Sequence, residues 1–309
     1  MADFCRIGAE IRVGAMFLDP KLPKDPKYEL CQYEGIKLDF RGPKRNLSGE
    51  FVAFLGSTET FGKYVETPFP DRLQKLIGTV CVNLGCRNIS VDGLLNEPGV
   101  TDIASRAKLT VLQVPCATGI NNKYYHVHPR RNDRFLNAKE PLTALFPKVD
   151  FTEFNFTRHM LSELKNKSES KFARITEELT KRWIVRMKRL LGRIDSPVLL
   201  LWFSGRCPEE EFEHPEIRFQ PSLVRRDMID ELQQHASAFF EFDTASGMRA
   251  NNVDHALIDK VFARLSKRVF LDVPGQSAHD RAAKELAPVI VKLLQDKAKG
   301  PRKGGPLHT

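Results

Sequence analysis

The chain lacks any apolar run near the ~18 residues of a membrane-spanning helix, so no membrane span is predicted. It also lacks a C-x-x-C pair, because its six cysteines are scattered and several lie in apolar runs. That pattern predicts buried, reduced thiols rather than disulfides. The first residues contain no basic region followed by a long apolar run, so no secretory signal is expected. Together these absences predict a cytoplasmic protein.

Two further patterns are missing: a repeat of fixed period, and the interleaved aromatic and basic residues of a nucleic-acid platform. The net charge of +9 favours anionic partners. Part of that charge lies in residues 297–309, where Lys and Arg occur among Gly and Pro without any acid. This segment is expected to be a disordered basic tail. We therefore expect a small-molecule, glycan or lipid partner with an acidic group, and no specific nucleic acid.

What the sequence does contain is a series of short apolar runs separated by helical patterns. The runs predict five strands, at residues 51–55, 80–85, 109–115, 196–205 and 238–243. Helices are expected to begin near Pro70, to run from about Glu163 to Ile194, and to occupy 223–236, 251–265 and the stretch after 279. Strands that alternate with helices predict an α/β protein whose mostly parallel sheet is covered on both faces.

The expected domain lies between two segments of different character. Residues 1–50 are punctuated by prolines and are expected to form an extension packed on the core, with a strand or hairpin in its second half. Residues 51–296 are expected to form one α/β domain. Within it, residues 123–160 are rich in aromatic residues and arginine and are interpreted as an insertion.

The stretch FVAFLGSTETFGKY, residues 51–64, places a polar turn at the carboxyl end of the first predicted core strand. The letters G-S-T-E-T-F-G-K match the phosphate-loop pattern G-x-x-x-x-G-K after a strand. The run at 269–272, VFLD, could act as the second, magnesium-binding strand. However, Tyr64 stands where Ser or Thr should meet the metal, and Pro68 and Pro70 interrupt the helix that should follow. A phosphate-loop nucleotide-binding protein is therefore the less favoured alternative.

The same stretch, followed by PFPDRLQKLIG and VCVNLG, resembles the start of the SGNH (GDSL-type) hydrolases. The resemblance covers residues 51 to about 122, with a weaker echo near the C-terminus. The spacing of the blocks and the run HPRRNDRF also resemble an uncharacterised bacterial family of SGNH-like domain proteins with degenerate catalytic blocks. The resemblance implies a three-layer αβα sandwich with a flavodoxin-like, five-stranded sheet.

The resemblance also implies site residues. Thr58 stands at the position of the nucleophilic serine, and Ser57 lies one residue earlier. Gly85, with Asn121 or Asn122, would donate hydrogen bonds to an oxyanion. His279 would be the general base just before the last helix, but Gln276 replaces the aspartate expected three residues earlier, and Asp272 is the nearest acid before it.

A second polar concentration, HVHPRRNDRF at 126–135, follows the third predicted strand. Arg130, Arg131 and Arg134 could grip a phosphate, sulfate or carboxylate at the mouth of the pocket. The alternative is a surface loop whose salt bridges include Asp133. His126 and His128 lack a third ligand at motif spacing, so neither a metal site nor a cofactor is predicted.

Two functions therefore remain open. One is an SGNH-like ester hydrolase or acyltransferase acting on a substrate with an anionic group. The other is a catalytically degenerate SGNH-like binding domain for an anionic or carbohydrate ligand. The sequence specifies neither the substrate nor the oligomeric state.

Overall fold

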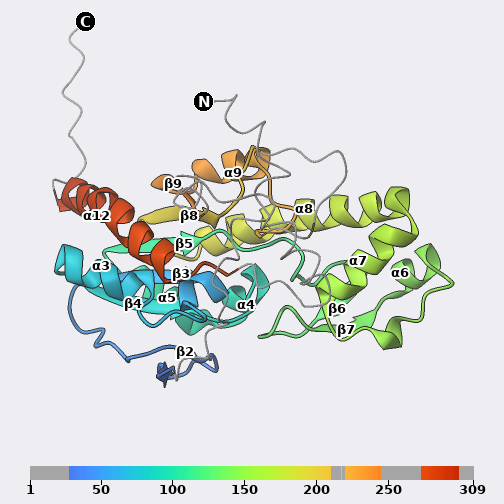
Figure 1. The fold of residues 1–309 in the computed structure, drawn as a ribbon, viewed down its shortest axis with the longest axis horizontal. Coiled ribbons are helices and arrows are strands. Elements are labelled where there is room, and N and C mark those ends of the chain that lie inside the picture. The colour runs from blue at the N-terminus through green and yellow to red at the C-terminus, as the bar shows by residue number, and fades with distance from the viewer. Residues whose placement is uncertain (1–27, 210–216, 218–219, 245–272, 299–309) are drawn as a thin grey trace, which may run out of the picture.

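A computed structural model describes residues 28–209, 217, 220–244 and 273–298 (Figure 1). Several expectations fall outside these residues. They are the first half of the N-terminal extension, the helix at 251–265, the run at 269–272 with Asp272, and the tail beyond residue 298.

Five parallel strands form the central sheet, in the order β4-β3-β5-β8-β9. Numbered along the chain within this sheet, the order is 2-1-3-4-5, which is the flavodoxin-like arrangement. The predicted α/β class, five strands and flavodoxin-like topology are therefore confirmed. The strands are β3 (Phe51–Gly56), β4 (Val80–Gly85), β5 (Leu109–Gln113), β8 (Val198–Ser204) and β9 (Ala238–Asp243).

Each face of the sheet is buried, because alternate residues of a strand enter different apolar clusters. In β3, Val52 and Phe54 pack on one side, whereas Phe51, Ala53 and Leu55 pack on the other. The first side is covered by α3 (Phe69–Ile77) and α12 (Gln276–Ala298), which lie together in Figure 1. The second side is covered by α4 (Val91–Leu95), α5 (Pro98–Arg106), α8 (Glu169–Leu191) and α9 (Arg226–Gln233). This gives the three layers expected of an αβα sandwich.

The single long helix predicted from about Glu163 to Ile194 is wrong, since the structure has two helices there. They are α7 (Thr157–Lys167) and α8, with Ser168 between them. Ser168 adopts an extended backbone and its hydroxyl accepts a hydrogen bond from the Lys171 N–H, so it ends one helix and caps the next. The last helix also begins earlier than expected, so that His279 lies inside its first turn.

The segments outside the sheet are small hairpins and short helices. The predicted N-terminal hairpin is β1 (Leu30–Cys31) paired antiparallel with β2 (Phe40–Arg41). The 123–160 segment contains β6 (Tyr125–Val127), β7 (Phe135–Ala138), α6 (Glu140–Leu145), the 3₁₀ helix η1 (Phe151–Glu153) and the start of α7. It gathers with α7 at the end of the molecule away from α12 (Figure 1). Among the described residues, no helix has the length and apolar character needed to cross a bilayer.

Candidate functional site at the carboxyl edge of the sheet

The turn after β3 is built on two glycines that allow close backbone packing. After Gly56 and Ser57 comes the single helical turn α2 (Thr58–Phe61), which ends at Gly62 in the left-handed region with φ of 75°. A Cβ on Gly56 would overlap the Thr60 hydroxyl, and a Cβ on Gly85 would overlap the Phe61 nitrogen. The glycines therefore let α2 fit against the ends of β3 and β4.

Gln113, the last residue of β5, fills the crevice at the start of α2. Its Oε1 accepts hydrogen bonds from the Ser57 N–H and Thr60 N–H, both at 3.1 Å, and from the Thr60 hydroxyl at 2.5 Å. Its Nε2 donates to Glu59 at 2.7 Å. This crevice is the switch point of the 2-1-3-4-5 order, where such folds often bind phosphate on backbone N–H groups. Here two of those N–H groups already have a side-chain acceptor.

The phosphate-loop alternative does not fit this geometry. In a phosphate loop the Gly-Lys pair opens a helix, whereas Gly62 and Lys63 come after α2 has ended. The Lys63 ammonium lies 4.6 Å from the centre of the Tyr64 ring. The residues that match G-x-x-x-x-G-K therefore do not adopt the arrangement of a phosphate loop.

Thr58 is held by Asn88, which lies in the turn after β4. The Thr58 hydroxyl donates to Asn88 Oδ1 at 3.2 Å and accepts from the Asn88 N–H at 3.1 Å. Asn88 has a φ of 59°, a conformation that asparagine tolerates better than most residues. Both hydrogen-bonding roles of the Thr58 hydroxyl are thus satisfied by one neighbour. Ser57 differs, since it is half-buried and its side chain makes no capping hydrogen bond.

The loop at 128–134 is attached to the same turn. Asn88 Nδ2 donates to Asp133 Oδ2 at 3.2 Å, and the Asn132 N–H donates to the Asn88 carbonyl at 3.0 Å. Asn132 also accepts from the Ser90 N–H at 2.7 Å. Burial raises the pKa of Asp133, and the charges of Arg131 and Arg134 oppose that rise. A connected path therefore runs from Thr58 through Asn88 to the arginine-rich loop.

The three arginines of this loop lie at its surface. Arg131 is exposed, while Arg130 and Arg134 are half-buried, and the Arg134 guanidinium lies 4.3 Å from the centre of the Phe156 ring. His128 Nδ1 accepts from the Arg130 N–H at 3.2 Å and from the Arg131 N–H at 3.1 Å, which shapes the loop.

The predicted oxyanion donors all have partners within the protein. The Gly85 N–H donates to Asn83 Oδ1 at 2.9 Å. Asn122 is buried, donates to the Ile120 carbonyl and accepts from the N–H groups of Tyr124 and Tyr125.

Asn121 is engaged in the same way. Its backbone N–H donates to Asp92 Oδ2 at 2.8 Å, and its side chain also hydrogen-bonds Asp92. Its Oδ1 accepts from the Val127 N–H at 3.0 Å and lies 3.3 Å from His126 Nδ1. To bind an oxyanion, these groups would have to exchange their present partners.

His279 is fully buried in the layer formed by α3 and α12. Its ring lies 5.8 Å from the Phe69 ring and 5.5 Å from the Phe203 ring, measured between centroids. Its Nδ1 accepts from the Phe69 N–H at 3.1 Å, which places the proton on Nε2. Burial, with the charge of Arg41, lowers the pKa of His279 to about 3. The ring is therefore neutral, its acceptor nitrogen Nδ1 is already hydrogen-bonded, and no described contact joins it to Thr58 or Ser57.

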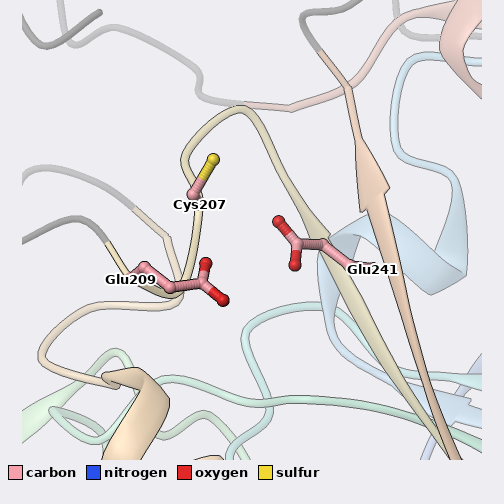
Figure 2. A group of neighbouring side chains, drawn as sticks. All are labelled: Cys207, Glu209 and Glu241. Atoms are coloured by element: carbon pink, nitrogen blue, oxygen red, sulfur yellow. The ribbon is translucent and has the colours of Figure 1, made fainter. Parts of the chain in front are cut away.

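One group among the described residues could offer three metal ligands. Cys207, Glu209 and Glu241 place their ligand atoms within 4.8 Å of one another, after β8 and on β9 (Figure 2). Glu209 also pairs with Arg226 at 3.2 Å. These side chains were not singled out by the sequence, because they are not at a recognised ligand spacing.

Two residues at the sheet edge were not predicted as part of the site. Gln113 is a polar residue at the end of an apolar strand, and this was the available signal. Asn88 lies three residues after Gly85, in the polar turn CRNISVD that follows β4, and that turn was the available signal.

Comparisons with known proteins give a family and distant structural likenesses. A goat rumen metagenome lipase, Lip_vut3, is 14% identical with a TM-score of 0.36, over 78% of this chain and 97% of that one. A putative GDSL-like lipase from Bacteroides ovatus is 15% identical with a TM-score of 0.37, over 81% of this chain and 55% of the other. A gut microbial diltiazem-metabolizing enzyme is 10% identical with a TM-score of 0.39, over 82% and 48%.

The last two matches span about half of those longer chains, and likenesses at this level say nothing of activity. No curated protein sequence matches the chain. One family model matches residues 16–294, which is most of the sequence. The chain therefore belongs to the family described as Domain of unknown function (DUF6473).

Proposed function

We propose that the carboxyl edge of the sheet is a binding site for a small anionic ligand, at the mouth formed by Ser57, Thr58, Asn88 and the 128–134 loop. The observation that carries this proposal is the path of hydrogen bonds from Thr58 through Asn88 to Asp133. It fixes the cationic loop beside the polar turn of β3. Ligands of open α/β sheets bind at this edge.

The arginines supply the recognition. Arg130, Arg131 and Arg134 offer planar guanidinium groups that suit carboxylate or phosphate oxygens. Asp133 neutralises part of this charge, and it is held to the fold through Asn88. The surface therefore keeps a positive excess around an anchored loop.

Binding is favoured over catalysis because Thr58 and His279, two of the three groups expected to react, are engaged. The Thr58 hydroxyl contacts an amide oxygen rather than a base, and an amide does not accept a proton at neutral pH. Nδ1 of His279 accepts a hydrogen bond from the Phe69 N–H, so it is not free to act as a base. A pocket of SGNH type without a base beside its nucleophile would retain binding and lose hydrolysis.

The experiment is a calorimetric titration of the full chain with citrate and with inorganic phosphate. Changing Arg131 and Arg134 to Gln should weaken binding at least about tenfold, since hydrogen bonds to charged groups contribute ~1.5–3 kcal/mol each. Arg189→Gln removes one positive charge from the exposed face of α8, as each single change at Arg131 or Arg134 does, and should leave the affinity unchanged. Equal weakening by Arg189→Gln would reduce the effect to net charge and contradict a site.

A second candidate, an ester hydrolase or acyltransferase, is favoured by Ser57. Its hydroxyl lies at the start of α2 without a capping hydrogen bond, so it remains available for attack. Treatment with a fluorophosphonate probe, followed by peptide mapping, tests this directly. Labelling that disappears in Ser57→Ala and persists in Thr58→Val would establish a serine nucleophile. Absence of labelling and of 4-nitrophenyl acetate hydrolysis would leave binding as the function.

A further inference from the structure

A surface groove between the 123–160 segment and helix α8 shares no lining residue with the candidate site. It has a volume of about 440 Å³ and is lined by Lys123, Tyr124, Pro141, Ala144, Leu145 and Arg174. The residues come from three places: the stretch just before β6, helix α6 and helix α8. A volume of this size falls within the ~300–1,000 Å³ typical of small-molecule pockets.

The groove has fixed walls. The Lys139 N–H donates to the Tyr124 carbonyl at 2.8 Å, and the Lys139 ammonium donates to the Asn122 carbonyl at 2.5 Å. These hydrogen bonds hold the start of α6 against the residues just before β6. Tyr124 is itself buried, so its ring is part of the packed structure rather than a free surface group. The groove is therefore preformed.

Its charge has one sign. Two of the six lining residues are cations and none is an acid. The neighbouring Glu178 already pairs with Arg182 at 2.8 Å, and its contact with Lys123, at 3.9 Å, is long for an ion pair. Arg174 is exposed, and no ion pair of its side chain occurs within the described part of α8 and its neighbours. The Lys123 ammonium also lies 5.0 Å from the centre of the Tyr124 ring. A carboxylate would therefore bind Arg174 directly and would compete with Glu178 for Lys123.

We propose that this groove is a second ligand site, for a small amphiphilic anion that combines a carboxylate with an aromatic or alkyl body. The body would lie along Tyr124, Pro141, Ala144 and Leu145, and the carboxylate would meet Lys123 and Arg174. The basic segment 297–309 is not the expected occupant, since its lysines and arginine carry the same charge as the groove.

The test is saturation-transfer NMR and calorimetry on the full chain, with 2-naphthoate as the probe and 2-naphthalenemethanol as its neutral counterpart. Saturable binding of naphthoate, with the alcohol at least about tenfold weaker, is expected from loss of the charged contacts. Ala144→Trp should abolish binding by filling the groove, and Arg174→Gln should weaken it by about tenfold. Thermal melting of each variant checks that the fold is retained.

Two controls separate this site from other sources of affinity. Arg189→Gln, on the same helix, should leave naphthoate binding unchanged. Ala144→Trp should leave the affinity for citrate unchanged, so that this site and the sheet-edge site fail independently. Naphthoate affinity that survives both Ala144→Trp and Arg174→Gln, or equal binding of the alcohol, would overturn the proposal.

Discussion

At the scale of single residues, Gly56 and Gly85 tolerate substitution least, because a Cβ at either position would overlap atoms of α2. Gly85→Ala would push a methyl group into the Phe61 backbone, which cannot move as a flexible side chain could. We expect the free energy of unfolding to fall by about 3 kcal/mol, as for other overpacked positions. Urea denaturation measures it.

Gly49→Ala is the matched control for this change. A Cβ at Gly49 meets nothing within 4 Å, so its effect should stay within about 0.5 kcal/mol. Similar losses for the two variants would show that α2 is not packed as described.

His279 predicts a dependence of stability on pH. Its pKa is about 3 in the folded chain and ~6.5 when unfolded, so between these values the unfolded state binds the extra proton. The stability is complete above pH ~6.5 and falls as the pH is lowered. One buried ring should account for a loss of about 2 kcal/mol between pH 7 and pH 5.

The comparison is with His279→Asn, whose side-chain oxygen can still accept from the Phe69 N–H. Urea denaturation at pH 5, 6 and 7 should show a lower but flatter stability for this variant. Equal slopes for the two proteins would mean that the ring of His279 is accessible to protons in the folded state.

At the scale of elements, the strands could be predicted because both faces of the sheet are covered. A strand buried on both sides is an unbroken apolar run, which needs no alignment to detect. The break between α7 and α8 was missed because Ser168 acts through its backbone conformation and its cap, neither of which interrupts the apolar spacing. The adjacency of the β3 turn and the arginine loop followed from parallel strands ending at one edge.

The candidate site was less predictable than the sheet. A motif gives the order of residues, but it does not say whether a ring faces a pocket or a core. His279 has the spacing of a base and lies among phenylalanines, while Gln113, which has no motif, holds the start of α2. Hydrogen bonds of this kind depend on side-chain direction, which spacing alone does not determine.

The first residues of α12 hold the segment before α3 and α3 itself in place. Gln276 Oε1 accepts from the N–H groups of Glu66 and Thr67, both at 3.1 Å, and Asp280 pairs with Arg72 at 2.9 Å. Gln276→Ala should speed amide exchange at Glu66 and Thr67 by about fivefold, because one hydrogen bond contributes ~1 kcal/mol. Hydrogen–deuterium exchange measures the exchange rates of these two amides. Lys284→Ala, at an exposed position of the same helix, should leave those rates unchanged.

At the scale of the whole molecule, helix α8 connects the turn after β4 with the turn after β5, at the carboxyl edge of the sheet. Trp183 Nε1 donates to the Pro115 carbonyl at 3.0 Å, which fastens α8 to the turn after β5. One turn further along, Arg186 pairs with Asp92 of α4 at 3.3 Å. Asp92 also accepts from the Asn121 N–H at 2.8 Å. The turns after β4 and β5 are therefore connected through one carboxylate to the longest helix on that face.

Asp92 is buried, and burial raises its pKa against the opposing effects of the Asn121 N–H and Arg186. Removing the carboxylate leaves Arg186, whose side chain is 25% exposed, with less compensation for its charge. We expect Asp92→Ala to lower the free energy of unfolding by about 3 kcal/mol, as for a buried pair that loses one partner. In an Arg186→Met background the same change should cost about 1–2 kcal/mol less, and a double-mutant cycle in urea measures that coupling.

The exposed pair of Lys188 and Glu231 is the control, since Glu231→Ala should change stability by less than about 1 kcal/mol. Additive effects of the Asp92 and Arg186 changes would show that α8 and the turn after β4 are stabilised separately.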